Sequence, residues 1–125
     1  MCCYNGNDKP VKPIEASGIQ ICKDVDEDGF GVDCRSRFDY GIDKIYVVID
    51  YISYGTEKPI DVKWYKDGEY YFSDTFPYEE EEYGDDYYIY TSIPLESYRT
   101  LPSGSYQVKV FQDDVLITSS AFKIE

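Results

Sequence analysis

The segment Leu101-Pro102-Ser103-Gly104-Ser105-Tyr106-Gln107-Val108-Lys109-Val110-Phe111 decides the fold that this sequence predicts. Proline and glycine favour a tight turn, and this turn leads into a strand in which apolar and polar residues alternate. Tyr106, Val108 and Val110 therefore face the same side. We interpret the segment as a central strand of a β-sandwich, which the chain enters through a corner held by the Tyr106 side chain.

Composition and charge limit the number of domains, the type of secondary structure and the kinds of partner and catalysis that the chain can have. The 125 residues suffice for one domain with its own core, and the 15 tyrosines favour strands. The net charge of -13 disfavours nucleic acids and anionic membrane surfaces as partners. The chain has no histidine, which excludes Ser-His and Cys-His catalysis and removes the usual ligand of zinc and copper. We therefore do not expect an enzyme.

Further strands are predicted where apolar residues alternate between turn signals. They cover 44–52, 60–66, 69–72, 86–93 and 115–124, with turns at Asp67-Gly68 and Asp113-Asp114. The residues expected to face the core are Ile45, Val47, Ile49, Tyr51, Ile60, Val62 and Trp64. One helical turn is predicted at 96–98, and no long stretch keeps a helical period. The predicted fold class is all-β.

The N-terminal region has a different composition from the rest of the chain. Residues 1–16 contain two prolines and no periodicity, which predicts an extended arm or a disordered leader before a domain at 17–125. As an arm, the region could pair with the sheet edge of another copy, using the apolar residues within it and just after it, Val11, Ile14, Ile19 and Ile21. Cys2, next to Cys3, stands where a mature lipoprotein would carry its lipid, so membrane attachment is expected only through Cys2.

Residues 19–38 are predicted to form a β-hairpin. Pairing Cys22 with Cys34 leaves 27–29 as a three-residue loop with Gly29 in the left-handed position. Directly opposed cysteines lie close enough for a disulfide, which would add roughly 3 kcal/mol of stability. Two reduced thiols packed in the sheet are the alternative. A disulfide indicates an oxidising compartment, and hence an extracellular or cell-surface location.

The same hairpin contains the pattern Asp24-x-Asp26-x-Asp28-Gly29. Alternate carboxylates followed by glycine suit calcium, the one cofactor that the sequence indicates. The segment resembles a thrombospondin type-3 calcium repeat, although one residue is inserted before Asp33. The alternative is that Asp28 and Gly29 only form the turn.

The whole domain resembles an immunoglobulin-like sandwich. The resemblance rests on the inward Trp64 and on Leu101-Pro102-x-Gly104-x-Tyr106, which resembles a tyrosine corner. It covers about residues 17–125, which resemble immunoglobulin-like domains of bacterial and archaeal envelope proteins, often lipoproteins. It implies an antiparallel sandwich of about seven to eight strands. Val47 and Val108 stand where antibody domains have their cysteines, so antigen-type recognition is not implied.

These features predict a structural or adhesive module of the cell surface rather than an enzyme. Other copies of the chain, in a homo-oligomer or filament joined by the N-terminal arm, are the expected partners. The alternative is a ligand-binding module for carbohydrate or calcium, because tyrosines crowd the middle third of the chain. The acidic run 79–82, with Asp85 and Asp86, is expected to be a solvated loop, and binding of cations or of a basic partner is the alternative.

Overall fold

The computed structural model describes residues 10–93 and 100–125. This part of the chain contains nine strands and no helix, so no helix within it could cross a membrane. The strands are β1 Glu15–Val25, β2 Gly31–Cys34, β3 Arg37–Phe38, β4 Tyr46–Ile52, β5 Ile60–Lys66, β6 Glu69–Phe76, β7 Asp86–Ser92, β8 Gly104–Gln112 and β9 Val115–Ile124. The predicted lipid site Cys2 and the predicted helical turn at 96–98 lie outside the described residues.

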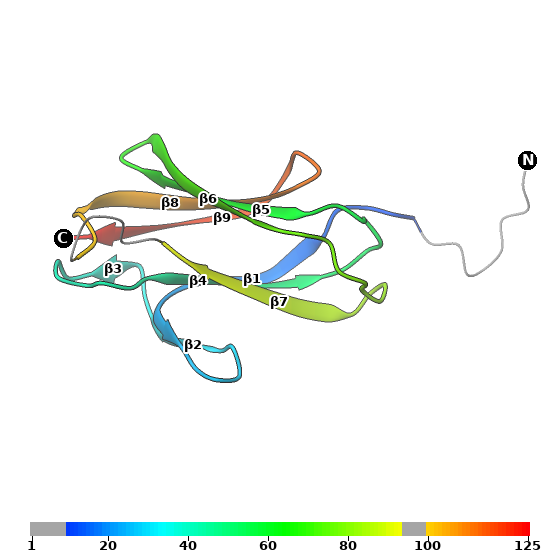
Figure 1. Cartoon of the computed structure of the whole chain (residues 1–125), viewed down its shortest axis with the longest axis horizontal. Helices are drawn as coiled ribbons and strands as arrows, with labels where there is room; N and C mark the ends of the chain where they lie inside the picture. Colours follow the sequence, from blue (N-terminus) through cyan, green and yellow to red (C-terminus); the bar gives the residue numbers. More distant parts are fainter. Residues whose placement is uncertain (1–9, 94–99) are drawn as a thin grey trace, which may run out of the picture.

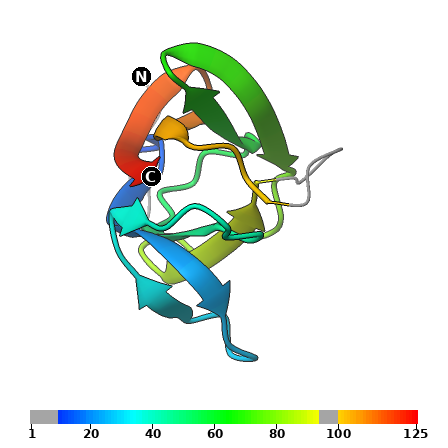
Figure 2. The ribbon, with the colours of Figure 1, turned by 90° about the vertical axis from the view of Figure 1, so that its left-hand side faces the viewer.

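Two sheets pack face to face (Figure 1, Figure 2). One has the strand order β2-β1-β4-β7 and the other the order β3-β9-β8-β5-β6. Pairing between named strands is antiparallel except where β3 runs parallel to the end of β9. The predicted all-β sandwich is thus confirmed, and β3 is the strand that the sequence did not indicate. A two-residue strand is too short to show alternation.

Trp64 and Tyr106 lie at the centre of the core, and their side chains are 0% and 2% exposed. Phe122 of β9 joins them: its ring stacks on Tyr106 at 4.9 Å and meets Trp64 edge-on at 6.2 Å. All the residues predicted to face inward on these strands are buried, namely Ile45, Val47, Ile49, Tyr51, Ile60, Val62, Val108 and Val110. The two sheets are therefore held together by one apolar layer.

The predicted corner before β8 is present. The Tyr106 hydroxyl donates a hydrogen bond of 2.5 Å to the carbonyl of Pro102, four residues earlier. Leu101, which is fully buried, donates its amide to the carbonyl of Ile42 at 2.9 Å. These contacts fix the direction in which the chain enters β8.

The two predicted hairpin turns also form. Asp67 and Gly68 have φ angles of 51° and 86°, and Asp113 and Asp114 have φ angles of 52° and 62°. Positive φ at both central residues matches the twist of the flanking strands. Aspartate tolerates this backbone better than most residues that have a Cβ atom.

The N-terminal segment belongs to the sandwich from residue 12 onward. The amide of Lys12 donates to the carbonyl of Tyr54 at 3.2 Å, and the Ile14 amide donates to Oε1 of Gln112 at 2.7 Å. The first strand then begins at Glu15, inside the range that the sequence assigned to an arm.

This placement corrects part of the predicted self-association arm. Ile14 and Ile21 are each 4% exposed and lie in the core, and Ile19 packs against it. Strand β1 pairs with β4 along this stretch, so these side chains point between the sheets of their own domain. Of the four predicted arm residues, Val11 remains on the surface, with 68% of its area exposed.

Candidate functional site

A disulfide-bonded hairpin projects from the four-stranded sheet (Figure 1). The structure contains the predicted bond between Cys22 and Cys34, whose Cα atoms lie 3.9 Å apart on directly paired positions. Gly29 has a φ of 86°, as predicted for the turn. Gly31 is required for another reason: a Cβ atom there would lie 2.4 Å from the Cys22 sulfur.

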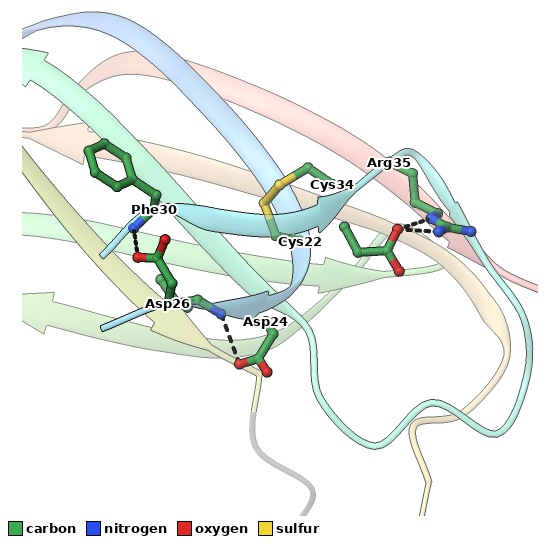
Figure 3. The surroundings of a disulfide bond; sticks show 8 residues. Cys22, Asp24, Asp26, Phe30, Cys34 and Arg35 are labelled. Atoms are coloured by element: carbon green, nitrogen blue, oxygen red, sulfur yellow. Dashed lines mark hydrogen bonds and ion pairs between the residues drawn. A yellow bond between two sulfur atoms is a disulfide. The ribbon is translucent and has the colours of Figure 1, made fainter. Parts of the chain in front are cut away.

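The three aspartates of this hairpin do not converge on a common point. Oδ1 of Asp26 accepts the amide of Phe30 (Figure 3) and also that of Asp28, each at 2.9 Å, and thereby shapes the turn. Oδ1 of Asp24 accepts the amide of Val25 at 2.8 Å. Within 10–93 and 100–125, no three acidic or cysteine side chains are grouped closely enough to hold a metal ion. Asp26 thus shapes the turn in which Asp28 and Gly29 lie, and calcium binding by Asp24, Asp26 and Asp28 stays a prediction.

The hairpin turn rests against β7. The Tyr88 hydroxyl donates to the carbonyl of Asp28 at 3.1 Å, and a Cβ atom at Gly29 would lie 2.3 Å from the Tyr88 ring. The next residue, Phe30, is 69% exposed. The surface of β7 and the projecting turn therefore form one continuous face.

Strand β7 ends its sheet with an unpaired edge. In the described chain, β4 is the one strand that pairs with it. The amide of Ile93 donates to the carbonyl of Ile45, and the amide of Ser53 donates to the carbonyl of Asp85, both at 3.1 Å. Backbone groups of an antiparallel strand alternate in direction, so the odd-numbered residues bond to β4. The N–H and C=O groups of residues 86, 88, 90 and 92 consequently point outward, away from β4.

The side chains of β7 alternate in step with the backbone. Tyr88 and Tyr90 are 51% and 46% exposed on the outer face, and Tyr87 and Ile89 turn toward the core. Thr91 also faces inward and donates its hydroxyl to Asp74 of β6 at 2.5 Å. This bond joins the margins of the two sheets and does not involve the outward backbone groups of β7, which no described strand pairs.

A pocket of about 200 Å3 lies beside the start of β7, under the loop that connects β6 to β7. Its lining residues include Tyr51, Tyr78 and Tyr87 and the glutamates at 79, 80 and 81. The sequence treated this acidic run as a solvated loop and Tyr51 as a core residue. The pocket could not be foreseen because five separate segments of the chain form it.

Tyr51 anchors the acidic loop to the sheet. Its hydroxyl donates to Oε2 of Glu81 at 2.5 Å, and its ring stacks on Tyr87 at 5.9 Å. The Tyr87 hydroxyl in turn accepts the amide of Glu82 at 2.7 Å. Burial, followed by the hydrogen bond to Glu81, raises the pKa of Tyr51 well above its ordinary value of 10.0. Tyr51 is therefore a neutral hydrogen-bond donor at physiological pH.

This raised pKa makes stability depend on pH in the alkaline range. Above about pH 10 the phenol of an unfolded chain ionises, whereas folded Tyr51 keeps its proton. The free energy of unfolding should therefore fall as the pH rises through this range. Urea titrations at pH 9 and pH 10.5 should show a smaller fall for Tyr51→Phe, which has no phenol at this position. An equal fall in both proteins would contradict the assignment.

Comparisons with known proteins bear on the fold. No family model matches the chain, and no curated protein matches it. Among solved structures, it is similar to an immunoglobulin-like protein, PA1606, from Pseudomonas aeruginosa, with a TM-score of 0.63 and 13% identity. The match covers 91% of this chain and 98% of that one. The arrangement of two sheets around Trp64 and Tyr106, with this likeness, defines an immunoglobulin-like β-sandwich.

A second similar structure belongs to a larger protein, the alkylpurine DNA glycosylase AlkC of Pseudomonas fluorescens, bound to DNA containing an abasic site analog. The TM-score is 0.60 at 12% identity, and the match covers 90% of this chain. The chain spans 30% of the length of that protein. At these identities both likenesses describe the fold alone.

Proposed function

We propose that this immunoglobulin-like domain is a non-enzymatic structural or adhesive module that works outside the cytoplasm and joins to other copies through β7. The observation that supports this most is the outward row of backbone groups at residues 86, 88, 90 and 92, which β4 leaves unpaired. An unpaired edge of this kind is a template for a further strand. The Cys22–Cys34 disulfide supports an oxidising location.

The sequence of β7 suits antiparallel pairing with its own copy. If the two strands cross at Ile89, Tyr88 of one copy lies opposite Tyr90 of the other, and Asp86 lies opposite Ser92. Two aromatic pairs then form on the outer face, each contributing about 0.2–1 kcal/mol. No acidic residue of β7 faces another acidic residue in this register. In this register polar residues pair with polar residues at the ends of the two strands, and tyrosines pair with tyrosines at the centre, so the edge is complementary to its own copy.

Tyr90→Pro tests this pairing, because it removes an outward N–H group without removing a hydrogen bond to β4. Tyr90→Thr is the matched control, since it keeps the N–H group and removes the ring. Sedimentation velocity over a range of concentrations should show association for the natural chain, weaker association for Tyr90→Thr, and monomers for Tyr90→Pro. Association should strengthen with salt, because two chains of charge -13 repel each other. A natural chain that stays monomeric at every concentration and salt would overturn the proposal.

The N-terminal arm is the other segment that was predicted to pair with the sheet edge of a neighbouring copy. Residues 12 and 14 already bond within the domain, so we expect deletion of residues 1–9 to leave association unchanged. If this deletion abolishes association and Tyr90→Pro does not, the N-terminal arm supplies the strand that pairs with the next copy, and the proposed β7 pairing is wrong.

Carbohydrate binding is the second candidate, favoured by the neighbouring exposed rings of Tyr88 and Tyr90. Tyrosine rings can stack on the apolar face of a sugar. In a glycan array, Tyr90→Thr would then lose binding as completely as Tyr90→Pro. This pattern differs from strand pairing, in which the proline variant has the larger effect.

A further inference from the structure

The pocket beneath the β6–β7 loop combines features that strand pairing does not use. It is a hollow of about 200 Å3, which is smaller than the pockets of drug-sized ligands, at roughly 300–1,000 Å3. A single side chain or a small molecule would fill it, and an oligosaccharide would not. The pocket adjoins the exposed tyrosine face of β7, because Tyr88 belongs to both, but it is also lined by residues of β4, β5 and the loop before β7.

The walls of the pocket favour a cation with an apolar body. Tyrosine rings attract cations through their electron-rich faces, and the lining residues include Tyr78 and Tyr87, with the buried Tyr51 stacked on Tyr87. Ile60 and Phe76 add apolar surface. An alkyl chain would lie against these groups, with its charged end near the rings.

The carboxylates around the pocket are not neutralised by the described part of the chain. Glu79, Glu80 and Glu81 line the hollow, and none of them forms an ion pair with a described residue. Lys58 also lines it, but its ammonium group lies more than 4 Å from every described carboxylate oxygen. Tyr51 holds Glu81 in place through its hydroxyl. Three glutamates and one lysine among the lining residues leave an excess of negative charge, which disfavours anions and attracts cations.

We propose that this pocket binds a primary alkylammonium group, either that of a small amine or that of a lysine side chain on a partner protein. The alkyl chain contacts Ile60 and Phe76, the ammonium group lies beside Tyr78 and Tyr87, and the glutamates balance its charge. This site does not depend on pairing through β7, so either proposal can fail alone.

Butylammonium chloride is a direct probe, and butan-1-ol is its uncharged match. Titration followed by amide shifts in NMR spectra should show saturable binding of butylammonium at about 1–10 mM, with shifts centred on residues 77–81 and 87–89. Butan-1-ol should bind with an affinity at least about tenfold lower than that of butylammonium. Equal binding of the alcohol would show an apolar hollow without cation selectivity and would overturn the proposal.

The acidic run supplies a matched pair of variants. Glu80 lines the pocket and Glu82 does not, although both carry the same charge in the same loop. Glu80→Gln should weaken butylammonium binding about threefold to tenfold, whereas Glu82→Gln should leave it nearly unchanged. Tyr78→Leu should weaken it without altering the loop charge. If both glutamine variants weaken binding equally, the attraction is a diffuse effect of the acidic loop and the site does not exist.

A lysine compound identifies the source of the ammonium group. Nα-acetyl-lysine N-methylamide presents the same ammonium group on a backbone with no free charge. Binding at least as tight as that of butylammonium, with the same shifts, supports a lysine side chain of a partner protein. Binding of butylammonium alone supports a free amine. Failure of both compounds to bind would refute the pocket proposal, with the β7 association still open to its own test.

Discussion

Replacing Trp64 with alanine should lower the free energy of unfolding by about 3–5 kcal/mol, the largest effect expected from any single substitution. The side chain is fully buried, and its ring meets Phe122 edge-on at 6.2 Å between the two sheets. Truncation would leave a cavity that the surrounding strands cannot close, because their backbone positions are fixed by pairing on both sides. Guanidinium unfolding followed by circular dichroism measures the loss.

Two control variants sharpen this result. Tyr70→Ala removes an aromatic ring that is 61% exposed, and should cost less than about 0.5 kcal/mol. Trp64→Phe should cost much less than Trp64→Ala, because phenylalanine keeps most of the apolar volume. The indole N–H of Trp64 has no hydrogen-bond partner among the described residues, so its removal sacrifices no bond. A loss below about 1 kcal/mol for Trp64→Ala would contradict the central position of this residue.

Removing the disulfide should give the second large effect, a loss of roughly 3 kcal/mol in the chain-entropy model. The bond joins residues 12 positions apart and closes the projecting hairpin. The double variant Cys22→Ala/Cys34→Ala and the reduced natural chain should therefore unfold at similarly reduced guanidinium concentrations.

Cys2 and Cys3 require a control in this experiment, because reductant also acts on them. The double variant should be insensitive to reductant, while the natural chain should become less stable on its addition. If reductant destabilises both proteins equally, the stabilising bond is not the one between Cys22 and Cys34.

Features of the fold that depend on interactions between residues close in the sequence could be predicted from the sequence alone. The turn at Asp67-Gly68 follows from two adjacent residues, and the Cys22–Cys34 register follows from the loop between them. The inward face of β8 follows from the alternation of Tyr106, Val108 and Val110. In each case the information lies within about a dozen residues, which is the range over which strand alternation and turn chemistry operate.

Long-range contacts decided the features that the sequence did not reveal. The burial of Ile14 depends on Gln112, a residue of β8 that accepts its amide. Ile19 and Ile21 were assigned both to the predicted hairpin and to the arm, and the structure places them in β1 of the domain. The pocket requires Tyr51, Tyr78 and Tyr87 to meet, and no local pattern brings β4, β7 and the loop before β7 together.

Amide hydrogen exchange along β7 tests most directly the claim that this strand presents a free edge for pairing. In dilute solution the amides of Ile89 and Thr91 should exchange slowly, because they bond to β4, and those of Tyr88 and Tyr90 should exchange quickly. At concentrations at which the chain associates, all four amides should become protected. Protection of Tyr88 and Tyr90 in dilute monomers, or their continued rapid exchange in the associated state, would contradict the account.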